Sequence, residues 1–522
     1  MTGRRVKRGF ARENAKARTM QALIGVDIGT QGTKAVLVSE DGTLLASSFR
    51  KSTLHQPGAG VVEENPERQV ATVCATIKEC VGKSRIAPGN VSALAIDAQM
   101  AGIIGVGKDG RNVTPYDSWL DTRCGAYITQ MNRVAGDEII AKTGGPASFN
   151  HGPKILWWKH ERADVFRSIA TFVQPGGYAA MRLCGLTARD AFIDKTYLHF
   201  SGFADNQSGC WNAGLCRRFG FDAGKLPRIV NPHQIVGELA VSMASRCSLR
   251  AGVPVVAGCG DTAASFLACG ATRAGICVDV AGTASVFATT THTFKPDRRY
   301  KTLSCGQAAT PGLWHPYAYI NGGGMNLEWF RKQIAGFGSS ARLPEFADLN
   351  AAAEAIEPMP ELPMFVPHLG GRVSPGWPAL RGAWVGLTWA HNTPHLWRAM
   401  LEGVALEYAI YQQVLLHLHP KLHLVELRIT GGGERSALWN QMKADVLGTP
   451  VAQVTRSEGA PLGAALLAGF GIGLIKDLDA TARKWIRAGK AIQPNRRLGR
   501  YYQQRLAAYE AVLKSLNDWS KN

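Results

Sequence analysis

The chain has 522 residues, of which 46% are hydrophobic and 19% are charged, a composition typical of a globular protein large enough for two domains. No run approaches the roughly 18 to 20 apolar residues that a membrane-spanning helix needs, which argues against a membrane protein. The basic first residues are not followed by an apolar stretch, which argues against a secretory signal.

The formal net charge of +19 raises the question of a nucleic-acid partner. Residues 1–19 hold seven Lys or Arg and one acid, and we predict that they form a disordered extension or precede a true start at Met20. A nucleic-acid or targeting arm is the alternative. The remaining excess is spread without a basic run or interleaved aromatic residues. We therefore expect no nucleic-acid partner, because an anionic nucleotide or phosphosugar is sufficient.

The eleven cysteines are scattered, with no Cys-x-x-Cys spacing and none after Cys305. This odd count favours reduced thiols and a cytoplasmic protein over a disulfide framework or a zinc site.

Residues 24–38 contain two apolar, β-branched runs around a Gly/Thr/Gln segment, which predicts a β-hairpin with a polar tip. Asp27 lies in the first run, where a buried carboxylate needs a cation or hydrogen-bond donors. The glycines of the tip permit unusual backbone angles, and Thr30 and Thr33 add hydroxyl donors. The tip could therefore bind a phosphate chain while Asp27 faces a magnesium ion. A hairpin with a structural Asp at its edge is an equally supported alternative.

Farther along, a helix is predicted from Pro66 to about Lys83 with Asn65 as its cap, and a strand over residues 91–98. Asp121 and Arg123 then lie two residues apart, on one face of an extended segment. They could contact the hydroxyls of a polyol. The spacing alone favours the alternative, a structural Asp–Arg pair that caps the next helix.

A buried strand beginning at Pro254 ends in Gly258-Cys259-Gly260, which Asp261 follows directly. A carboxylate at the carboxyl end of a strand, with glycines that give a ligand clearance, is a usual place for a catalytic group. Asp261 could instead cap a helix that starts near Ala263. We prefer the catalytic role because a second hairpin follows so closely.

That second hairpin, residues 278–287, repeats the strand, the acid, the Gly-Thr tip and the return strand. We infer a duplicated nucleotide-binding fold with a ligand between its halves.

Residues 321–325 form a Gly-rich loop without the spacing of a dinucleotide fingerprint. Residues 429–436 again predict a strand, a Gly turn and the start of a helix. The glycines allow close approach of a base or ribose, and Ser436 can act as the helix cap. Further helices are predicted over 395–417, 461–468 and 500–515.

These residues resemble the FGGY carbohydrate kinases, and most of all the xylulokinase-like group, from Met20 to about Arg505. The motifs that carry the resemblance are Asp27–Lys34, Gly260–Thr262, Gly382–Leu387 with His395–Glu402, and Thr430–Gly433 with Trp439–Asp445. The resemblance implies an α/β, two-lobed actin/hexokinase-like ATPase fold of duplicated ribonuclease H-like domains with an interlobe cleft. It divides the chain into an N-terminal lobe for sugar and phosphates, 20–262, and a C-terminal lobe for adenosine, 263–522.

By this resemblance, Asp261 removes the proton of the substrate hydroxyl, and Asp27 helps to hold Mg²⁺-ATP. The phosphates would be surrounded by Thr30, Gln31, Thr33, Gly282 and Thr283, the adenosine by Gly432, Gly433 and Ser436, and the sugar by Gln99, Met100, Trp119, Asp121 and Arg123.

The expected activity is ATP-dependent phosphorylation of a small sugar, with the ketopentose D-xylulose as the leading candidate. Ribulose, erythritol and glycerol are the alternatives. A non-catalytic sugar or nucleotide regulator is a further one, against which Asp261 and the two hairpins argue. Two departures concern the sugar: Ala101 stands where the group usually has His, and His151 where a small residue or Pro is usual. The oligomeric state is left open, with a homodimer as one expectation.

Overall fold

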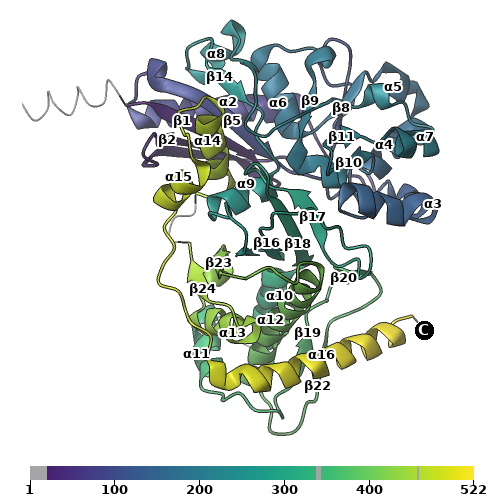
Figure 1. Ribbon diagram of the computed structural model, residues 1–522, viewed down its shortest axis with the longest axis vertical. Helices are drawn as coiled ribbons and strands as arrows, with labels where there is room; N and C mark the ends of the chain where they lie inside the picture. The colour runs from purple at the N-terminus through teal and green to yellow at the C-terminus, as the bar shows by residue number, and fades with distance from the viewer. Residues whose placement is uncertain (1–19, 337–342, 455–457, 522) are drawn as a thin grey trace, which may run out of the picture. The chain divides into compact units, whose positions relative to one another are not determined.

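The computed structural model describes residues 20–336, 343–454 and 458–521, so the predicted extension over 1–19 lies outside the described residues. The chain folds into two compact units (Figure 1). Within the described ranges, unit 1 comprises residues 20–272, 306–313 and 458–486, and unit 2 comprises residues 273–305, 314–336, 343–454 and 487–521.

Unit 1 is built on a six-stranded sheet in the order β13-β14-β5-β1-β2-β3. Its strands are β1 (Ala22–Ile28), β2 (Gly32–Ser39), β3 (Leu44–Lys51), β5 (Val91–Ala98), β13 (Ile235–Glu238) and β14 (Pro254–Val256). The first three strands form an antiparallel meander, and β5 and β14 extend the sheet in parallel with β1. The predicted hairpin and the predicted strand over 91–98 are therefore confirmed.

Unit 2 contains a second six-stranded sheet, in the order β17-β18-β16-β15-β23-β24. Its strands are β15 (Ile276–Ala281), β16 (Ser285–Thr289), β17 (Ser304–Gln307), β18 (Trp314–Ile320), β23 (Glu426–Thr430) and β24 (Val451–Gln453). Strands β18, β16 and β15 are antiparallel, and β15, β23 and β24 are parallel. This repeats the five-strand pattern β3-β2-β1-β5-β14 of unit 1, so the predicted duplication is confirmed.

Helices cover these sheets, and several begin where their capping residues predict. Helix α2 (Pro66–Ser84) starts at the predicted proline, and Asn65 Oδ1 accepts a hydrogen bond from the backbone N–H of Arg68 at 3.1 Å. The predicted helices over 395–417 and 500–515 are α12 (Thr393–Leu418) and α16 (Gly499–Trp519). The other helices are α3 (Gly125–Thr143), α4 (His151–Glu161), α5 (Ala163–Ser168), α6 (Pro175–Cys184), α7 (Ala213–Arg218), α8 (Val241–Cys247), α9 (Asp261–Ala268), α10 (Gly323–Phe330), α11 (Phe346–Glu354), α13 (Ala437–Leu447), α14 (Ala460–Gly471) and α15 (Leu478–Trp485).

Helix α14, although it comes late in the chain, packs on β1, β5 and α9 of unit 1. Glycines make this close packing possible, because a Cβ atom at Gly25 would lie 1.8 Å from the carbonyl oxygen of Pro461, and one at Gly463 would lie 2.2 Å from that of Ala264. Unit 1 therefore takes α14 and α15 from the end of the chain. The division differs in this respect from the single boundary after residue 262 that the sequence suggested.

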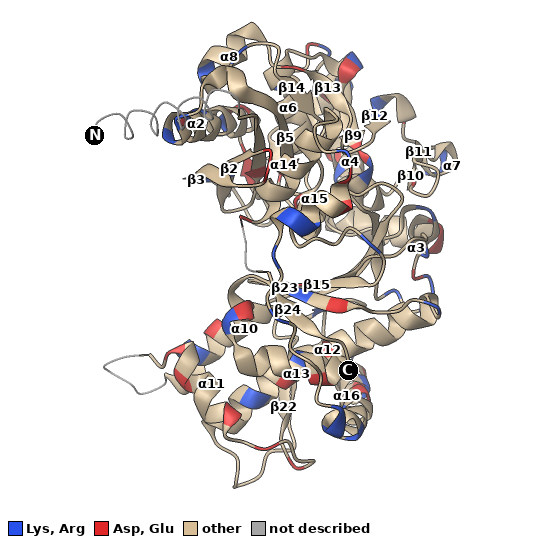
Figure 2. Cartoon of the chain, turned by 60° about the vertical axis from the view of Figure 1, so that its left-hand side comes forward, with Lys and Arg blue, Asp and Glu red and all other residues tan. Residues whose placement is uncertain are grey.

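Short two-stranded sheets complete the units, formed by β4 (Glu63–Glu64), β6 (Ile104–Val106), β7 (Tyr116–Asp117), β8 (Thr171–Val173), β9 (Phe192–Asp194), β10 (Ala204–Asp205), β11 (Cys210–Trp211), β12 (Arg228–Val230), β19 (Met364–Val366), β20 (Arg372–Val373), β21 (Gly376–Trp377) and β22 (Ala383–Val385). All eleven cysteines are free thiols, as expected. Among the residues described, no helix combines the length and apolarity needed to cross a membrane. Figure 2 shows Lys and Arg distributed over the elements of both units, interspersed with Asp and Glu.

The packing of α14 leads to a paired prediction. Gly25→Ala should destabilise unit 1 by about 1–3 kcal/mol, because its methyl group would collide with a backbone carbonyl that cannot move aside cheaply. Gly82→Ala is the matched control, since Gly82 lies within α2 with no atom within 4 Å of an added Cβ, and it should stabilise the helix by about 0.5–1 kcal/mol. Urea unfolding followed by circular dichroism measures both, and equal effects of the two substitutions would contradict the packing argument.

Candidate active site

Two carboxylates lie side by side in the central sheet of unit 1. Strands β1 and β5 are parallel neighbours, and their register places Asp27 directly opposite Asp97. Asp97 is completely buried, whereas Asp27 is partly exposed. Sequence reasoning missed Asp97. The signal was present, because Asp97 interrupts an apolar strand in the same way as Asp27 does.

The two carboxyl groups of this pair are hydrogen-bonded to each other. In the part of the chain that the structure describes, Asp27 Oδ1 and both oxygens of Asp97 are buried with no further partner from elsewhere in the protein. Burial raises the pKa of Asp27 to about 6. Burial and the adjacent charge of Asp27 raise the pKa of Asp97 well above its usual value. The pair therefore holds a proton between its carboxyl groups, and a cation that replaces this proton would compensate both of their charges.

A third carboxylate close to this pair is Asp261, which is the first residue of α9. Two glycines bring it there. A Cβ atom at Gly258 would lie 1.8 Å from the carbonyl oxygen of Ile96, so the segment after β14 runs close against β5. The carboxylate accepts hydrogen bonds from the backbone N–H and hydroxyl of Thr262, at 2.6 and 3.2 Å. Asp261 thus lies at the helix start, as the capping alternative held, although Gly260 occupies the cap position.

The electrostatic surroundings of Asp261 suit proton transfer. Burial, and secondarily the charge of Asp27, raise its pKa to about 7. The residue is still partly exposed to solvent. A carboxylate that titrates near neutral pH can accept a proton from an alcohol and release it again. Asp27, Asp97 and Asp261 therefore form one group, which we call the carboxylate cluster.

The hairpin tip is connected to predicted sugar-binding residues by a chain of hydrogen bonds. Trp119 Nε1 donates to Thr30 Oγ1 at 2.8 Å, and Thr30 Oγ1 donates to Gln99 Oε1 at 3.4 Å. Gln99 Nε2 in turn donates to Glu64 Oε1 at 3.1 Å. Trp119 remains 46% exposed, so part of the residue is accessible to a ligand. Glu64, which the sequence reasoning did not single out, orients the Gln99 amide.

The other residues of the tip differ in accessibility. The backbone N–H of Gly29 donates to the carbonyl of Gly32 at 3.0 Å and closes the turn. Gln31 is exposed at the tip, whereas Thr33 is buried on β2 opposite Ile28. Of these two predicted phosphate contacts, only Gln31 has an exposed side chain.

Asp121 and Arg123 form the structural ion pair that their spacing favoured, but they do not cap the next helix, because α3 has Cys124 at its cap position and no side-chain cap hydrogen bond. Arg123 Nε donates to Asp121 Oδ2 at 2.9 Å, and Arg123 Nη2 lies 2.8 Å from Asp117 Oδ1 and 2.9 Å from Glu63 Oε1. Asp121 is buried, and its Oδ2 also accepts from the backbone N–H of Val62 at 2.9 Å. These groups are saturated within the protein, so their contact with a sugar stays a prediction.

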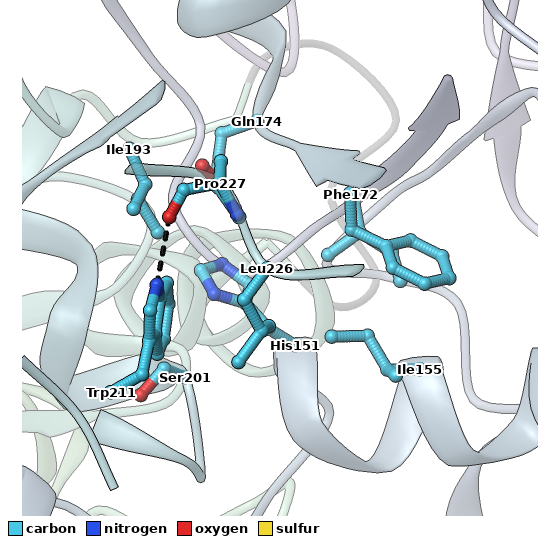
Figure 3. A pocket seen from close by; sticks show the side chains of 10 residues that line it. His151, Ile155, Phe172, Gln174, Ile193, Ser201, Trp211, Leu226 and Pro227 are labelled. Carbon is cyan, nitrogen blue, oxygen red and sulfur yellow. Dashed lines mark hydrogen bonds between the residues drawn. The ribbon is translucent and has the colours of Figure 1, made fainter. Parts of the chain in front are cut away.

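His151 contacts the backbone of Met100, one of the predicted sugar-binding residues. Its Nε2 lies 2.6 Å from the carbonyl oxygen of Met100, and burial lowers the pKa of His151 to about 4, so the ring is neutral at pH 7. His151 also lines the cavity in Figure 3, where Trp211 Nε1 donates to the carbonyl of Pro227 at 2.7 Å. With a volume of about 10 Å³, this cavity has room for one water molecule and none for a sugar.

In unit 2, the start of α10 packs against the tip of the second hairpin. The backbone N–H groups of Gly324 and Met325 donate to the carbonyls of Gly282 and Thr283, at 3.0 and 3.2 Å. A Cβ atom at Gly324 would lie 2.3 Å from the Gly282 oxygen, which explains the need for glycine there. The predicted loop over 321–325 is therefore only partly correct, because α10 already begins at Gly323, and Thr283 stays exposed.

The acid of the second hairpin is neutralised within the protein, unlike Asp27. Asp279 is completely buried, forms an ion pair with Lys443 and accepts a hydrogen bond from the hydroxyl of Tyr408 at 2.7 Å. Its neighbour on the parallel strand β23 is Ile429 rather than a second acid. The duplicated sheets thus carry an acid in comparable positions with opposite electrostatic surroundings.

The predicted adenosine residues lie between β23 and α13. Ser436 Oγ accepts from the backbone N–H of Trp439 at 3.2 Å, which confirms that Ser436 caps α13. A Cβ atom at Gly433 would lie 2.6 Å from that of Ala281, so this glycine serves packing, whereas Gly432 has open space beside it. Of the two glycines, Gly432 is the one that leaves room for a ligand.

The donor set in unit 1 fits a hard divalent cation, although no group of three or more His, Cys, Asp or Glu side chains within the described ranges could hold a metal by protein ligands alone. Buried carboxylate oxygens without partners are the ligands that Mg²⁺ prefers, with water and phosphate oxygens filling the other positions.

Known proteins of one family resemble the chain. Models of the FGGY family of carbohydrate kinases match it, the N-terminal domain over residues 22–268 and the C-terminal domain over 277–472. A xylulose kinase of Bacillus subtilis is 26% identical over 504 residues, or 96% of this chain and 98% of that protein. A gluconokinase of Bacillus subtilis is 26% identical over 469 residues, or 88% and 89%. The crystal structure of xylulose kinase from Rhodospirillum rubrum has a TM-score of 0.88 at 26% identity, covering 96% of this chain and all of that one (100%). The predicted fold class is confirmed by these likenesses.

The carboxylate cluster predicts an unusual effect of pH on stability. The pKa of Asp97 lies above its ordinary 3.8 in the folded protein, so the folded state retains a proton that the unfolded chain has lost. Stability therefore falls as the pH rises from about 4 towards the folded-state pKa, and Asp97→Asn removes that loss. In metal-free buffer, we expect a higher Tm for Asp97→Asn than for the wild type at about pH 8, and a much smaller difference at about pH 5.

Asp279→Asn is the matched control, because it removes the partner of a buried lysine. It should destabilise the protein by about 3–5 kcal/mol. A lower Tm for Asp97→Asn than for the wild type at about pH 8 would show that Asp97 is compensated in the folded state.

Proposed function

Because the chain belongs to the FGGY family of carbohydrate kinases and is an ATP-dependent sugar kinase, we propose that its acceptor is a ketopentose, with D-xylulose first, and that Asp261 is the general base. One observation carries the role of Asp261: a partly exposed carboxylate with a pKa near 7 lies at the start of α9, next to Asp27. The names of relatives that cover nearly the whole chain support the sugar.

In the proposed reaction, Asp261 takes the proton of the acceptor hydroxyl as the alcohol oxygen attacks the γ-phosphorus of ATP. The bond from that phosphorus to the bridging oxygen breaks, and ADP leaves. Transfer of this kind depends on positioning and on neutralisation of charge more than on covalent help from the protein. A bound Mg²⁺, for which Asp27 is the proposed ligand, would supply part of that neutralisation.

The proposed ligand contacts follow from accessibility. In unit 1, Trp119 is partly exposed and the side-chain amide of Gln99 is held by Glu64. Together, an aromatic residue and an amide suit an apolar face and the hydroxyls of a sugar. Gln31 and the exposed part of the first tip are proposed to contact phosphates, as is Thr283 in unit 2. Gly432 and Ser436 are proposed to contact the adenosine, with Gly433, Gly282 and Thr33 acting through the backbone.

D-Gluconate is a second candidate acceptor, because a gluconokinase resembles the chain at the same 26% identity as a xylulose kinase. Ala101 removes a side-chain donor that the xylulokinase-like pattern usually has beside Met100, which also bears on the choice of acceptor.

The acceptor is tested by ADP release in a coupled assay with D-xylulose, D-ribulose, D-gluconate, erythritol and glycerol, ranked by kcat/KM. We expect D-xylulose to rank first. A higher kcat/KM with D-gluconate or with a polyol would overturn the ketopentose assignment while leaving the kinase activity in place.

The base is tested by Asp261→Asn, which should lower kcat by about 10² to 10⁴-fold, because a general base contributes that much to such a step. ATP affinity, measured by calorimetry, should change little.

For the wild type, kcat/KM should rise with pH through about 7, since only the ionised carboxylate accepts a proton and burial holds the pKa of Asp261 near 7. Asp297→Asn is the control: Asp297 is a buried acid of unit 2 whose oxygens accept three backbone N–H groups, and its substitution should leave this profile unchanged. Near-normal turnover by Asp261→Asn would exclude it as the base.

A further inference from the structure

Asp97 has no place in the reaction as proposed so far, yet it is the most deeply buried acid of the carboxylate cluster. It is completely inaccessible to solvent, and it faces Asp27 across two parallel strands. Apart from the hydrogen bond between the two carboxyl groups themselves, neither oxygen of Asp97 nor Asp27 Oδ1 has a partner within the described ranges. The two adjacent buried carboxyl groups can therefore be ionised together only when a positive charge compensates them.

The charged groups around the pair supply that charge only in part. Lys34 lies opposite Asp27 on β2, and its charge lowers the pKa of Asp27. Its ammonium group, however, donates to the carbonyl of Glu458 at 3.0 Å and pairs with the Glu458 carboxylate at 3.2 Å. The other charged neighbour is Asp261, which adds negative charge. The charge of Lys34 is therefore shared with another acid.

The duplicated sheet of unit 2 provides the comparison. There, Asp279 on β15 has Lys443 as an internal cation, a tyrosine hydroxyl as a donor, and Ile429 as its parallel neighbour. In unit 1, the position of the parallel neighbour holds a second acid instead of an apolar residue, and no lysine is paired with it among the residues described. In unit 2 a lysine of the chain compensates the buried acid, whereas the acids of unit 1 need a cation from outside the chain.

We propose that Asp97 and Asp27 together form the protein's part of one divalent-cation site, so that the metal used with ATP is held by two adjacent carboxylates. This inference rests on the proposed function, because it concerns the metal of the same site. The ligand is a hard cation such as Mg²⁺ or Mn²⁺, which binds to carboxylate oxygens. Two protein ligands are enough, since Mg²⁺ at phosphate sites is usually bound through one or two carboxylates, with water and phosphate oxygens in the other positions.

The test measures metal binding directly, with Mn²⁺ as the probe and the full chain without sugar. Electron paramagnetic resonance counts free Mn²⁺ during titration, once without nucleotide and once with ADP. We expect Asp97→Asn and Asp27→Asn each to weaken Mn²⁺ binding by at least tenfold. The amide keeps the size of the side chain and removes its charge, and the Asp97→Asn variant is expected to be at least as stable as the wild type, so unfolding does not confuse the result.

Asp297→Asn is again the control, because Asp297 is as buried as Asp97 but its carboxylate is already satisfied by backbone N–H groups. It should leave Mn²⁺ affinity unchanged. The inference is overturned if Asp97→Asn binds Mn²⁺ with wild-type affinity in both titrations, in which case Asp97 is a protonated structural neighbour of Asp27. It is also overturned if the wild type binds no Mn²⁺ in either titration.

These outcomes are separable from those of the proposed function. If the wild type and the variants differ in Mn²⁺ affinity as expected but no sugar of the panel is phosphorylated, the acceptor assignment fails and the metal site stands. If D-xylulose is phosphorylated but Asp97→Asn retains full Mn²⁺ affinity, the metal site fails and the acceptor assignment stands.

Discussion

Burial of adjacent acids in the central sheet of unit 1 is the constraint on which the candidate site depends. Asp27 and Asp97 lie opposite each other on parallel strands, and Asp261 adds its charge from the start of α9. Burial raises the pKa values of all three, and the charge of Asp27 adds to this effect at Asp97 and Asp261. A site of this kind is costly for the folded protein and useful for a kinase, because a metal ion and a proton are what it takes up most readily.

Close backbone packing is what holds these acids in place. Gly258 lets the segment before Asp261 run against β5, and Gly25 lets α14 pack directly on β1. In both cases the contact is with backbone, so a side chain could not be accommodated by rotation of a neighbour. The carboxylate cluster therefore lies on strands and on a helix start, which are rigid elements, rather than on a mobile loop.

The comparison of the two sheets separates what duplication preserved from what it changed. Strand order and direction are the same over five strands, and each sheet begins with an acid before a Gly-Thr tip. The electrostatics differ, because Asp279 is paired with Lys443, whereas Asp27 faces Asp97. Asp279 is thus a structural acid, and only the acid of unit 1 has its charge left for a ligand.

The sequence by itself determined the elements that depend on local patterns: the hairpins, the strand over 91–98, the capped start of α2 at Asn65, the cap of α13 at Ser436, and the repeat that identifies a duplicated fold. It also singled out Asp27 and Asp261, since an acid in an apolar strand or after a Gly-rich strand end is visible without a structure. Tertiary structure alone decided which acid faces Asp27, that Lys443 neutralises Asp279, that Glu64 orients Gln99, and that α14 belongs to unit 1. The physical reason is that strand register and helix docking join residues separated by dozens to hundreds of positions, and these pairings are set by packing of the whole unit rather than by any local pattern.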